Sequence, residues 1–77
     1  MTTEQMREFA LLAEKRNYIA AAKALGTTQA SLSRHIMAME DELGFSLLER
    51  NTRNVELTPL GLRFLYYAQE SVRILNA

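Results

Sequence analysis

The sequence predicts a mainly α-helical domain in which a short β-hairpin precedes the last helix. Apolar residues recur at intervals of three and four in four segments, and residues that cap helices stand at the ends of these segments. In residues 45–58 the apolar positions alternate instead, and a polar stretch interrupts them. A chain of 77 residues is long enough for one domain with a small core.

The first two helices are predicted over residues 3–15 and 18–25. Thr2 begins a capping box before the first of them, and Asn17 is a good N-cap for the second. The second helix is rich in alanine, so another helix can approach it closely. Gly26 follows at the position that favours a left-handed helix end. A tight turn therefore leads into the third helix.

The third helix is predicted from Thr28 or Gln29 to Leu43, with Gly44 as its stop. One stripe of its surface is apolar and is predicted to face the core: Leu32, Ile36, Met39 and Leu43. At about 100° per residue, the opposite side carries Ala30, Arg34, Met37 and Asp41. The outward face therefore begins with small and basic side chains and becomes acidic only at its far end.

Residues 45–58 are predicted to form a short hairpin with Arg53 at its tip. Thr58 is a good N-cap, and Pro59 suits the first position of a helix because its backbone nitrogen has no hydrogen to leave unpaired. The last helix is therefore predicted from this point to about Asn76.

Charge is unevenly distributed along the chain, although the net charge is zero. No acid lies between Lys15 and Met39, and this window holds four basic residues and the single histidine: Lys15, Arg16, Lys23, Arg34 and His35. Such segregation creates a local positive potential that the total hides. A chance acid-free window is the alternative interpretation, because only 23% of the residues are charged.

Two short helices joined by a turn that begins with Gly26 match the helix-turn-helix arrangement, whose second helix enters the major groove of DNA. Hydroxyls and backbone amides at a helix N-terminus suit phosphate. A Gln can bridge adenine, an Arg can bridge guanine, and an Ala methyl can meet a thymine methyl. The candidate DNA-contacting residues on this helix are Thr28, Gln29, Ala30, Ser31, Ser33 and Arg34.

A hairpin directly after this unit makes a winged form. Arg53 is placed for a contact with the DNA backbone or the minor groove, and Arg50 lies at the end of a strand. For Arg50, a phosphate contact and a salt bridge to Glu49 or Glu56 are both open. The predicted architecture is a winged helix-turn-helix, with a three-helix core and a short β-hairpin wing, followed by a long C-terminal helix.

Several motifs occur in a fixed order and spacing: the pair Ala21–Ala22, TQASLSR at 28–34, E.ELG at 40–44, LLER at 47–50 and LT..G at 57–61. In this arrangement the whole chain resembles the N-terminal DNA-binding domain of LysR-type transcriptional regulators. The resemblance implies a winged helix-turn-helix followed by a linker helix that pairs two subunits. It also implies base contacts by Gln29 and Arg34, phosphate contacts by Thr28 and Ser33, and a minor-groove contact by Arg53.

The chain departs from the family pattern at a few positions. Ala30 stands where a Pro is common, and Thr27 stands where the family has an aliphatic residue. Ile19 and Ala20 replace a polar pair near the start of the second helix, which weakens the case for a phosphate contact there. Family members also carry a larger effector-binding domain. We therefore expect an excised DNA-binding domain, with any small-molecule effector acting only through a domain outside this chain.

The resemblance divides the chain into a DNA-binding domain, residues 1–57, and a linker helix, residues 58–77. The last helix has more apolar residues than so small a core can hide, which favours a homodimer through this helix, with a higher oligomer possible in a full-length protein. The stripe predicted to pair two copies is Leu65, Ala68, Val72 and Leu75. Tyr66, Tyr67 and Phe64 belong either to the dimer surface or to the side packed on the first helix.

We expect sequence-specific binding of double-stranded DNA by this dimer, with residues 28–43 in the major groove. The alternative is a winged-helix module that binds an acidic protein through its basic face. No catalytic set is recognisable, and we expect neither an enzyme nor a cofactor. A metal site is not expected either, because the chain has no Cys and His35 has no second ligand at helical spacing. No apolar run approaches the ~20 residues of a membrane span, so a cytoplasmic location is expected.

Overall fold

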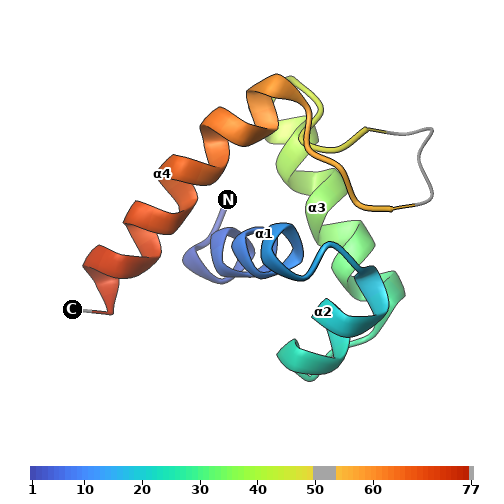
Figure 1. The fold of residues 1–77 in the computed structure, drawn as a ribbon. Helices are drawn as coiled ribbons and strands as arrows, with labels where there is room; N and C mark the ends of the chain where they lie inside the picture. The colour runs from blue at the N-terminus through green and yellow to red at the C-terminus, as the bar shows by residue number, and fades with distance from the viewer. Residues whose placement is uncertain (50–53, 77) are drawn as a thin grey trace.

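The computed structural model describes residues 1–49 and 54–76, and this part of the chain contains four α-helices (Figure 1). They are α1 (Thr3–Lys15), α2 (Tyr18–Leu25), α3 (Gln29–Leu43) and α4 (Pro59–Leu75). All four predicted helices are confirmed, each with bounds within one residue of those expected.

A side-chain cap begins each of these helices. The Thr2 hydroxyl accepts a hydrogen bond from the Gln5 amide at 3.1 Å, and the Gln5 side chain accepts one from the Thr2 amide at 3.0 Å. Asn17 caps α2, Thr28 caps α3 and Thr58 caps α4 in the same way. Each cap satisfies an amide that has no partner within its helix, which is why the helix starts could be predicted from single residues.

Two left-handed residues make the turns on either side of α2. Gly26 ends α2 with a φ of 72°, as its position predicts. Arg16 ends α1 with a φ of 54°, a conformation that the sequence did not indicate because residues with a Cβ rarely adopt it. These reversals are short, so α2 packs against both α1 and α3.

α1 lies at the centre of the molecule and packs against the other three helices (Figure 1). Its residues Phe9 and Leu12 have no exposed surface. Buried apolar side chains surround them from every other helix and from both sides of the hairpin: Ala21, Ala22, Leu32, Ile36, Met39, Leu47, Leu48, Val55 and Ala68. The predicted inward stripe of α3 is confirmed, since three of its members are buried and Leu43 packs at the edge of the core.

The hairpin is present as a short antiparallel pairing between α3 and α4. The Glu49 amide donates to the Glu56 carbonyl at 2.9 Å, and the Thr58 amide donates to the Leu47 carbonyl at 3.0 Å. One bridge, between Leu48 and Leu57, lies between these hydrogen bonds. The base of the predicted wing is thereby confirmed. Its predicted tip, with Arg50 and Arg53, lies outside the described residues.

The stripe predicted to pair two copies through α4 needs a correction. Ala68 has no exposed surface because it packs into the core of its own chain, and Leu65 and Val72 are half-buried. Phe64 also faces inward, with its ring centroid 5.7 Å from that of Phe9 on α1. Much of the 3-4-3 stripe is therefore the side of α4 that covers α1, because a repeat of apolar positions does not distinguish an intramolecular neighbour from a second copy.

Candidate nucleic-acid interface

The N-terminal half of α3 presents most of the predicted DNA-contacting residues to solvent. Thr28, Gln29, Ala30 and Arg34 are exposed, whereas Ser31 and Ser33 are half-buried. Ala30 and Arg34 lie on the side of the helix opposite the core stripe, as the helical spacing predicts. Gln29 precedes Leu32 of the core stripe by three residues and is exposed because it lies at the end of the helix. The exposed start of α3 therefore combines a hydroxyl, an amide, a methyl group and a guanidinium group.

Backbone polarity at the start of α3 favours an anion. The Thr28 hydroxyl accepts from the Ser31 amide at 3.0 Å, and the Thr28 carbonyl accepts from Leu32. The amides of Gln29 and Ala30 belong to the first turn of α3, so no carbonyl of the same helix can accept hydrogen bonds from them. The first turn contains no acid, so the positive end of the helix dipole is not neutralised there.

Two acids, one on α1 and one on α3, are turned inward and not toward this face. Glu8 and Glu40 are both only 7% exposed, and each has hydrogen-bonding partners inside the protein. On the outward side of α3, the first acid after Arg34 is Asp41, about 10 Å farther along the helix axis. The exposed N-terminal half of α3 therefore has a basic character that the zero net charge conceals.

One of these buried acids forms a link between α1 and α3 that sequence reasoning missed. The two carboxylate oxygens of Glu8 lie 3.0 Å and 2.9 Å from Nδ1 of His35. The Glu8 side chain is 10% exposed and that of His35 is 44% exposed, so the pair lies at the edge of the core. Because Nδ1–H donates to a carboxylate, the imidazole next to Arg34 is held in one orientation.

The second buried acid joins α3 to the base of the hairpin. The Glu40 carboxylate accepts from the Leu47 amide at 2.6 Å and from the Leu48 amide at 3.3 Å. We assigned no role to Glu40 from the sequence, although it follows Ile36 by four residues and therefore lies close to the apolar stripe of the helix. The carboxylate satisfies the amides where the chain leaves the helix and enters the hairpin.

The start of α2, the start of α3 and the returning strand of the hairpin meet at a small hollow. Its lining includes Ile19, Gln29 and Asn54. Ile19 is 68% exposed, an unusual position for a large apolar side chain. This arrangement puts the residue that departs from the family's polar pattern directly beside the candidate base-reading Gln29.

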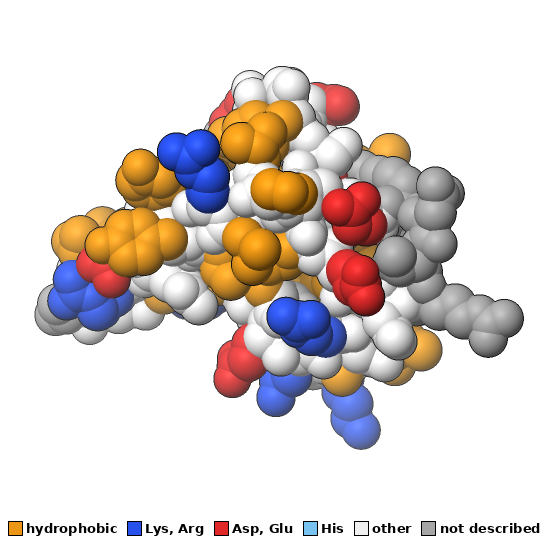
Figure 2. All heavy atoms as spheres, turned by 45° about the horizontal axis from the view of Figure 1, so that its top comes forward, with side chains coloured by type: hydrophobic (Ala, Val, Ile, Leu, Met, Phe, Trp, Pro, Cys, Tyr) orange, Lys and Arg blue, Asp and Glu red, His pale blue; other side chains and the backbone are white. Residues whose placement is uncertain are grey.

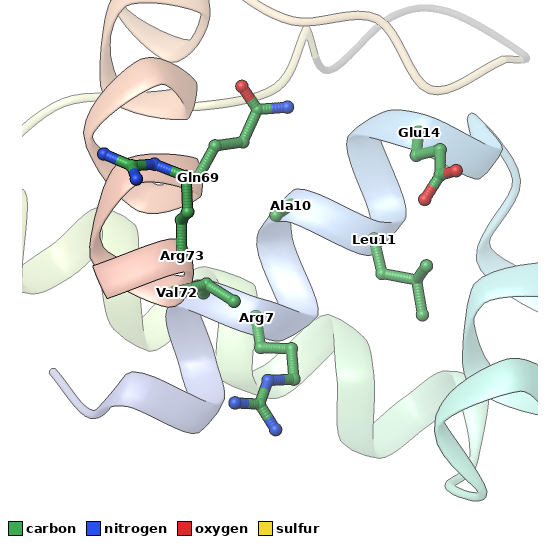
Figure 3. A pocket seen from close by; sticks show the side chains of 7 residues that line it. All are labelled: Arg7, Ala10, Leu11, Glu14, Gln69, Val72 and Arg73. Carbon is green, nitrogen blue, oxygen red and sulfur yellow. The ribbon is translucent and has the colours of Figure 1, made fainter. Parts of the chain in front are cut away.

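A groove between α1 and α4 lies apart from this surface (Figure 3). Arg7, Ala10, Leu11 and Glu14 line it from α1, and Gln69, Val72 and Arg73 line it from α4. No residue of α3 contributes to it, so it is not part of the candidate nucleic-acid interface.

Residues 1–49 and 54–76 contain no group of three or more His, Asp or Glu side chains that could hold a metal ion. No helix in the same part of the chain is both long and apolar enough to cross a membrane.

Comparison with known proteins identifies the family. Residues 3–62 match the family described as bacterial regulatory helix-turn-helix protein, lysR family. The chain belongs to the LysR family. Within that family it is 45% identical, over 76 residues, to a probable hydrogen peroxide-inducible genes activator of Mycobacterium avium. The aligned residues make up 99% of this chain and 24% of that protein. It is 42% identical over 77 residues to the transcriptional regulator IlvR of Caulobacter vibrioides, covering 100% of this chain and 26% of that protein.

The chain spans about a quarter of the length of these two regulators. Among solved LysR structures, the BenM DNA-binding domain in complex with catB site 1 DNA has a TM-score of 0.94 to this chain, with 37% identity, 99% coverage of this chain and 85% of that one. The CbnR DNA-binding domain in complex with DNA has a TM-score of 0.92, with 38% identity and coverages of 99% and 87%. The winged helix-turn-helix architecture predicted from the sequence is thereby confirmed.

Proposed function

We propose that this LysR-family domain binds double-stranded DNA in a sequence-specific manner, with α3 in the major groove. The observation that carries the proposal is the start of α3, where Gln29, Ala30 and Arg34 are exposed and no carboxylate lies within the first turns. These are side chains that can pair with adenine, meet a thymine methyl and pair with guanine. The similarity to the BenM and CbnR domains, each solved with DNA, supports the binding of DNA by this chain.

We assign the polar groups around this face to the DNA backbone. The free amides at the start of α3 and the Thr28 hydroxyl suit one phosphate, and Ser33 is placed on the flank for another. Ser31 is half-buried and can reach DNA only from the edge of the helix. For the wing, contacts of Arg50 and Arg53 with the backbone or minor groove remain predictions.

We further propose that two copies pair through the outer side of α4, whose apolar side chains are visible in Figure 2. Leu60, Tyr67 and Ile74 are spaced seven residues apart and are 45%, 64% and 62% exposed, so they form one line along the outer surface of the helix. In an antiparallel pair centred on Tyr67, Leu60 faces the partner's Ile74, as a two-fold interface requires. In this proposal these three residues take the pairing role first predicted for Ala68, because Ala68 is already buried in the core of its own chain.

In the context of a longer regulator, residues 1–57 would read DNA and residues 58–77 would link and pair the subunits. The relatives are about four times as long as this chain, so we place small-molecule sensing and any higher oligomer in the remainder of such a protein. We place the domain in the bacterial cytoplasm, where its DNA target lies. The family is one of regulators, and we propose neither an enzymatic activity nor a cofactor for the domain.

The experiment that tests DNA binding combines selection with salt dependence. Duplexes are selected from a random pool with the 77-residue chain, and affinity for the selected duplex is measured by fluorescence anisotropy at several salt concentrations. We expect a two-fold repeat in the selected sequence and an affinity that falls by about 10³-fold or more between 50 and 200 mM salt, because phosphate contacts release counterions.

The matched control is a random duplex of the same length. Equal affinity for the random and selected duplexes would contradict sequence-specific binding. A salt dependence close to zero would contradict phosphate contacts and would favour the alternative, a winged-helix module that binds protein.

A further inference from the structure

The backbone of Leu47 is the point where α3, the base of the hairpin and α4 are joined. Its amide donates to the Glu40 carboxylate of α3 at 2.6 Å. Its carbonyl accepts from the amide of Thr58, the N-cap of α4, at 3.0 Å. The side chain is fully buried, so both hydrogen bonds lie where water does not compete with them.

The N-terminus of α4 is held against this point by two further features. The Thr58 hydroxyl donates to the Ser46 carbonyl at 2.6 Å while it accepts from the Gly61 amide at 2.8 Å. Gly61 is buried, and a Cβ added to it would overlap the Leu47 carbonyl oxygen. Gly61 is therefore required for close approach of α4 to the wing base, and not for an unusual backbone angle.

The position of α4 relative to α3 is set by two connections, the packing of both helices on α1 and the contacts around Leu47. The described parts of these two helices do not pack against each other, and both pack against α1. Apart from this shared packing on α1, the described hydrogen bonds link α3 and α4 through the residues between them: Ser46, Leu47 and Leu48. These residues, with Glu40, Thr58 and Gly61, are called the Leu47 junction below.

We infer that the Leu47 junction sets the spacing at which the dimer reads two DNA half-sites, with Glu40 and Gly61 as positioning residues. This inference rests on the proposed binding of DNA by a dimer through α4. If α4 pairs two copies, its angle to α3 decides where the second recognition helix lies on the duplex. The junction fixes that angle at the end of α4 nearest to α3.

The length of α4 makes the distance between the two recognition surfaces of the dimer sensitive to small changes at the junction. The proposed two-fold axis passes Tyr67, eight residues and about 12 Å along α4 from Pro59, so a rotation of roughly 10° at the start of α4 displaces the axis by about 2 Å. A two-fold axis applies the displacement to both subunits, giving about 4 Å, which is comparable to the 3.4 Å between successive base pairs. A change at the junction therefore alters the preferred spacing by about one base pair.

The test uses Gly61→Ala, which forces α4 away from the Leu47 carbonyl, and Glu40→Gln, which removes the charge that holds the Leu47 and Leu48 amides. The selected half-sites are placed in a series of duplexes whose spacing changes by one base pair at a time. The affinity of the 77-residue chain for each duplex is measured by fluorescence anisotropy, at a temperature where circular dichroism shows the variant folded. Ala21→Gly, a buried substitution on α2 away from the junction, is the matched control for loss of stability.

We expect Gly61→Ala to shift or broaden the optimal half-site spacing. The ratio of affinities for the original spacing and for a spacing one base pair different should fall by about tenfold, which is the effect of one misplaced base pair. Glu40→Gln is expected to act in the same direction by less, because its amide oxygen can still accept from both the Leu47 and Leu48 amides and only the charge is lost. A single half-site should be bound as well as by the unaltered chain.

Equal weakening at every spacing by both variants, with an unchanged optimum, would overturn the inference, and so would a shifted optimum in Ala21→Gly. If Gly61→Ala does not fold, Glu40→Gln decides between these outcomes. Failure of the unaltered chain to discriminate selected from random duplexes would contradict the proposed function itself and is separately visible in the same titrations.

Discussion

Arg34 illustrates how a single side chain acquires a role from its surroundings. It is exposed, it lies on the face of α3 opposite the core, and no acid lies near it on that face. Its neighbour His35 points toward α1 and is bound to Glu8, so the two adjacent cationic or potentially cationic groups point in different directions. Arg34 is therefore the guanidinium group on α3 that is free to meet a base edge.

Substitution of Arg34 by Ala is expected to weaken specific DNA binding by about 1–3 kcal/mol and to relax the preference at one base pair. Selection from a random pool with the variant, followed by titration, measures both effects. Arg7→Ala removes the same charge from α1, where Arg7 contacts Glu4 and Asn76, and should leave the selected sequence unchanged. An Arg34→Ala variant that selects the same sequence would remove Arg34 from the base-reading residues.

The Glu8–His35 pair is expected to stabilise the fold. His35→Ala leaves a buried carboxylate without this partner and should lower the free energy of unfolding at neutral pH by about 1–3 kcal/mol. Urea unfolding of Glu8→Ala, His35→Ala and the double variant forms a double-mutant cycle. Strictly additive effects would show that the two side chains do not stabilise each other, whatever their separation.

At the scale of elements, the turn between α2 and α3 determines how the recognition helix is presented. Gly26 adopts a φ of 72° and donates to the last carbonyls of α2, and Thr28 then caps α3 two residues later. So short a turn holds the two helices in contact and leaves the start of α3 exposed. Backbone conformation, more than side-chain packing, is the constraint on Gly26, because a Cβ there would meet nothing within 4 Å.

Gly26→Ala is accordingly expected to lower the free energy of unfolding by about 1–2 kcal/mol, the cost of a left-handed conformation for a residue with a Cβ. Thermal unfolding followed by circular dichroism measures it. Gly26→Asn is the control, since Asn tolerates this conformation better and should cost less. An Ala variant as stable as the unaltered chain would show that the turn can adopt another conformation at no cost.

At the scale of the whole molecule, α4 carries apolar residues on two sides, one buried and one exposed. Ala68 and Phe64 belong to the inner side, which completes the core around α1. Leu60, Tyr67 and Ile74 belong to the outer side, where they are exposed in the single chain. A helix that is apolar on both sides is expected where one side serves the fold and the other serves an interface.

Tyr67→Lys and Ile74→Lys are expected to weaken the dimer by about tenfold or more each, because a charge would be buried at the centre or the end of the apolar line. Analytical ultracentrifugation across a range of concentrations measures the dissociation constant. Met37→Lys is the control, since Met37 is 51% exposed but lies on α3. A dimer unaffected by both α4 substitutions, or a chain that is monomeric without them, would contradict pairing through this side of α4.

Much of this architecture could be predicted from the sequence because its causes are local. Helix starts follow from single capping residues such as Asn17 and Thr58, and the inward stripe of α3 follows from residue spacing alone. The exposed position of Arg34 follows from the same spacing, and that of Gln29 follows from its place at the start of α3. Family resemblance then supplied the function that such an exposed face serves.

The sequence by itself thus determined the four helices, the place of the hairpin and the face of α3 that meets solvent, since each depends on residues within a few positions of one another. Only the tertiary structure decided that Glu8 binds His35, that Glu40 holds the Leu47 and Leu48 amides, and that Ala68 lies in the core. The physical reason is that burial and pairing depend on what packs against a side chain, and helical spacing gives its direction but not its neighbour.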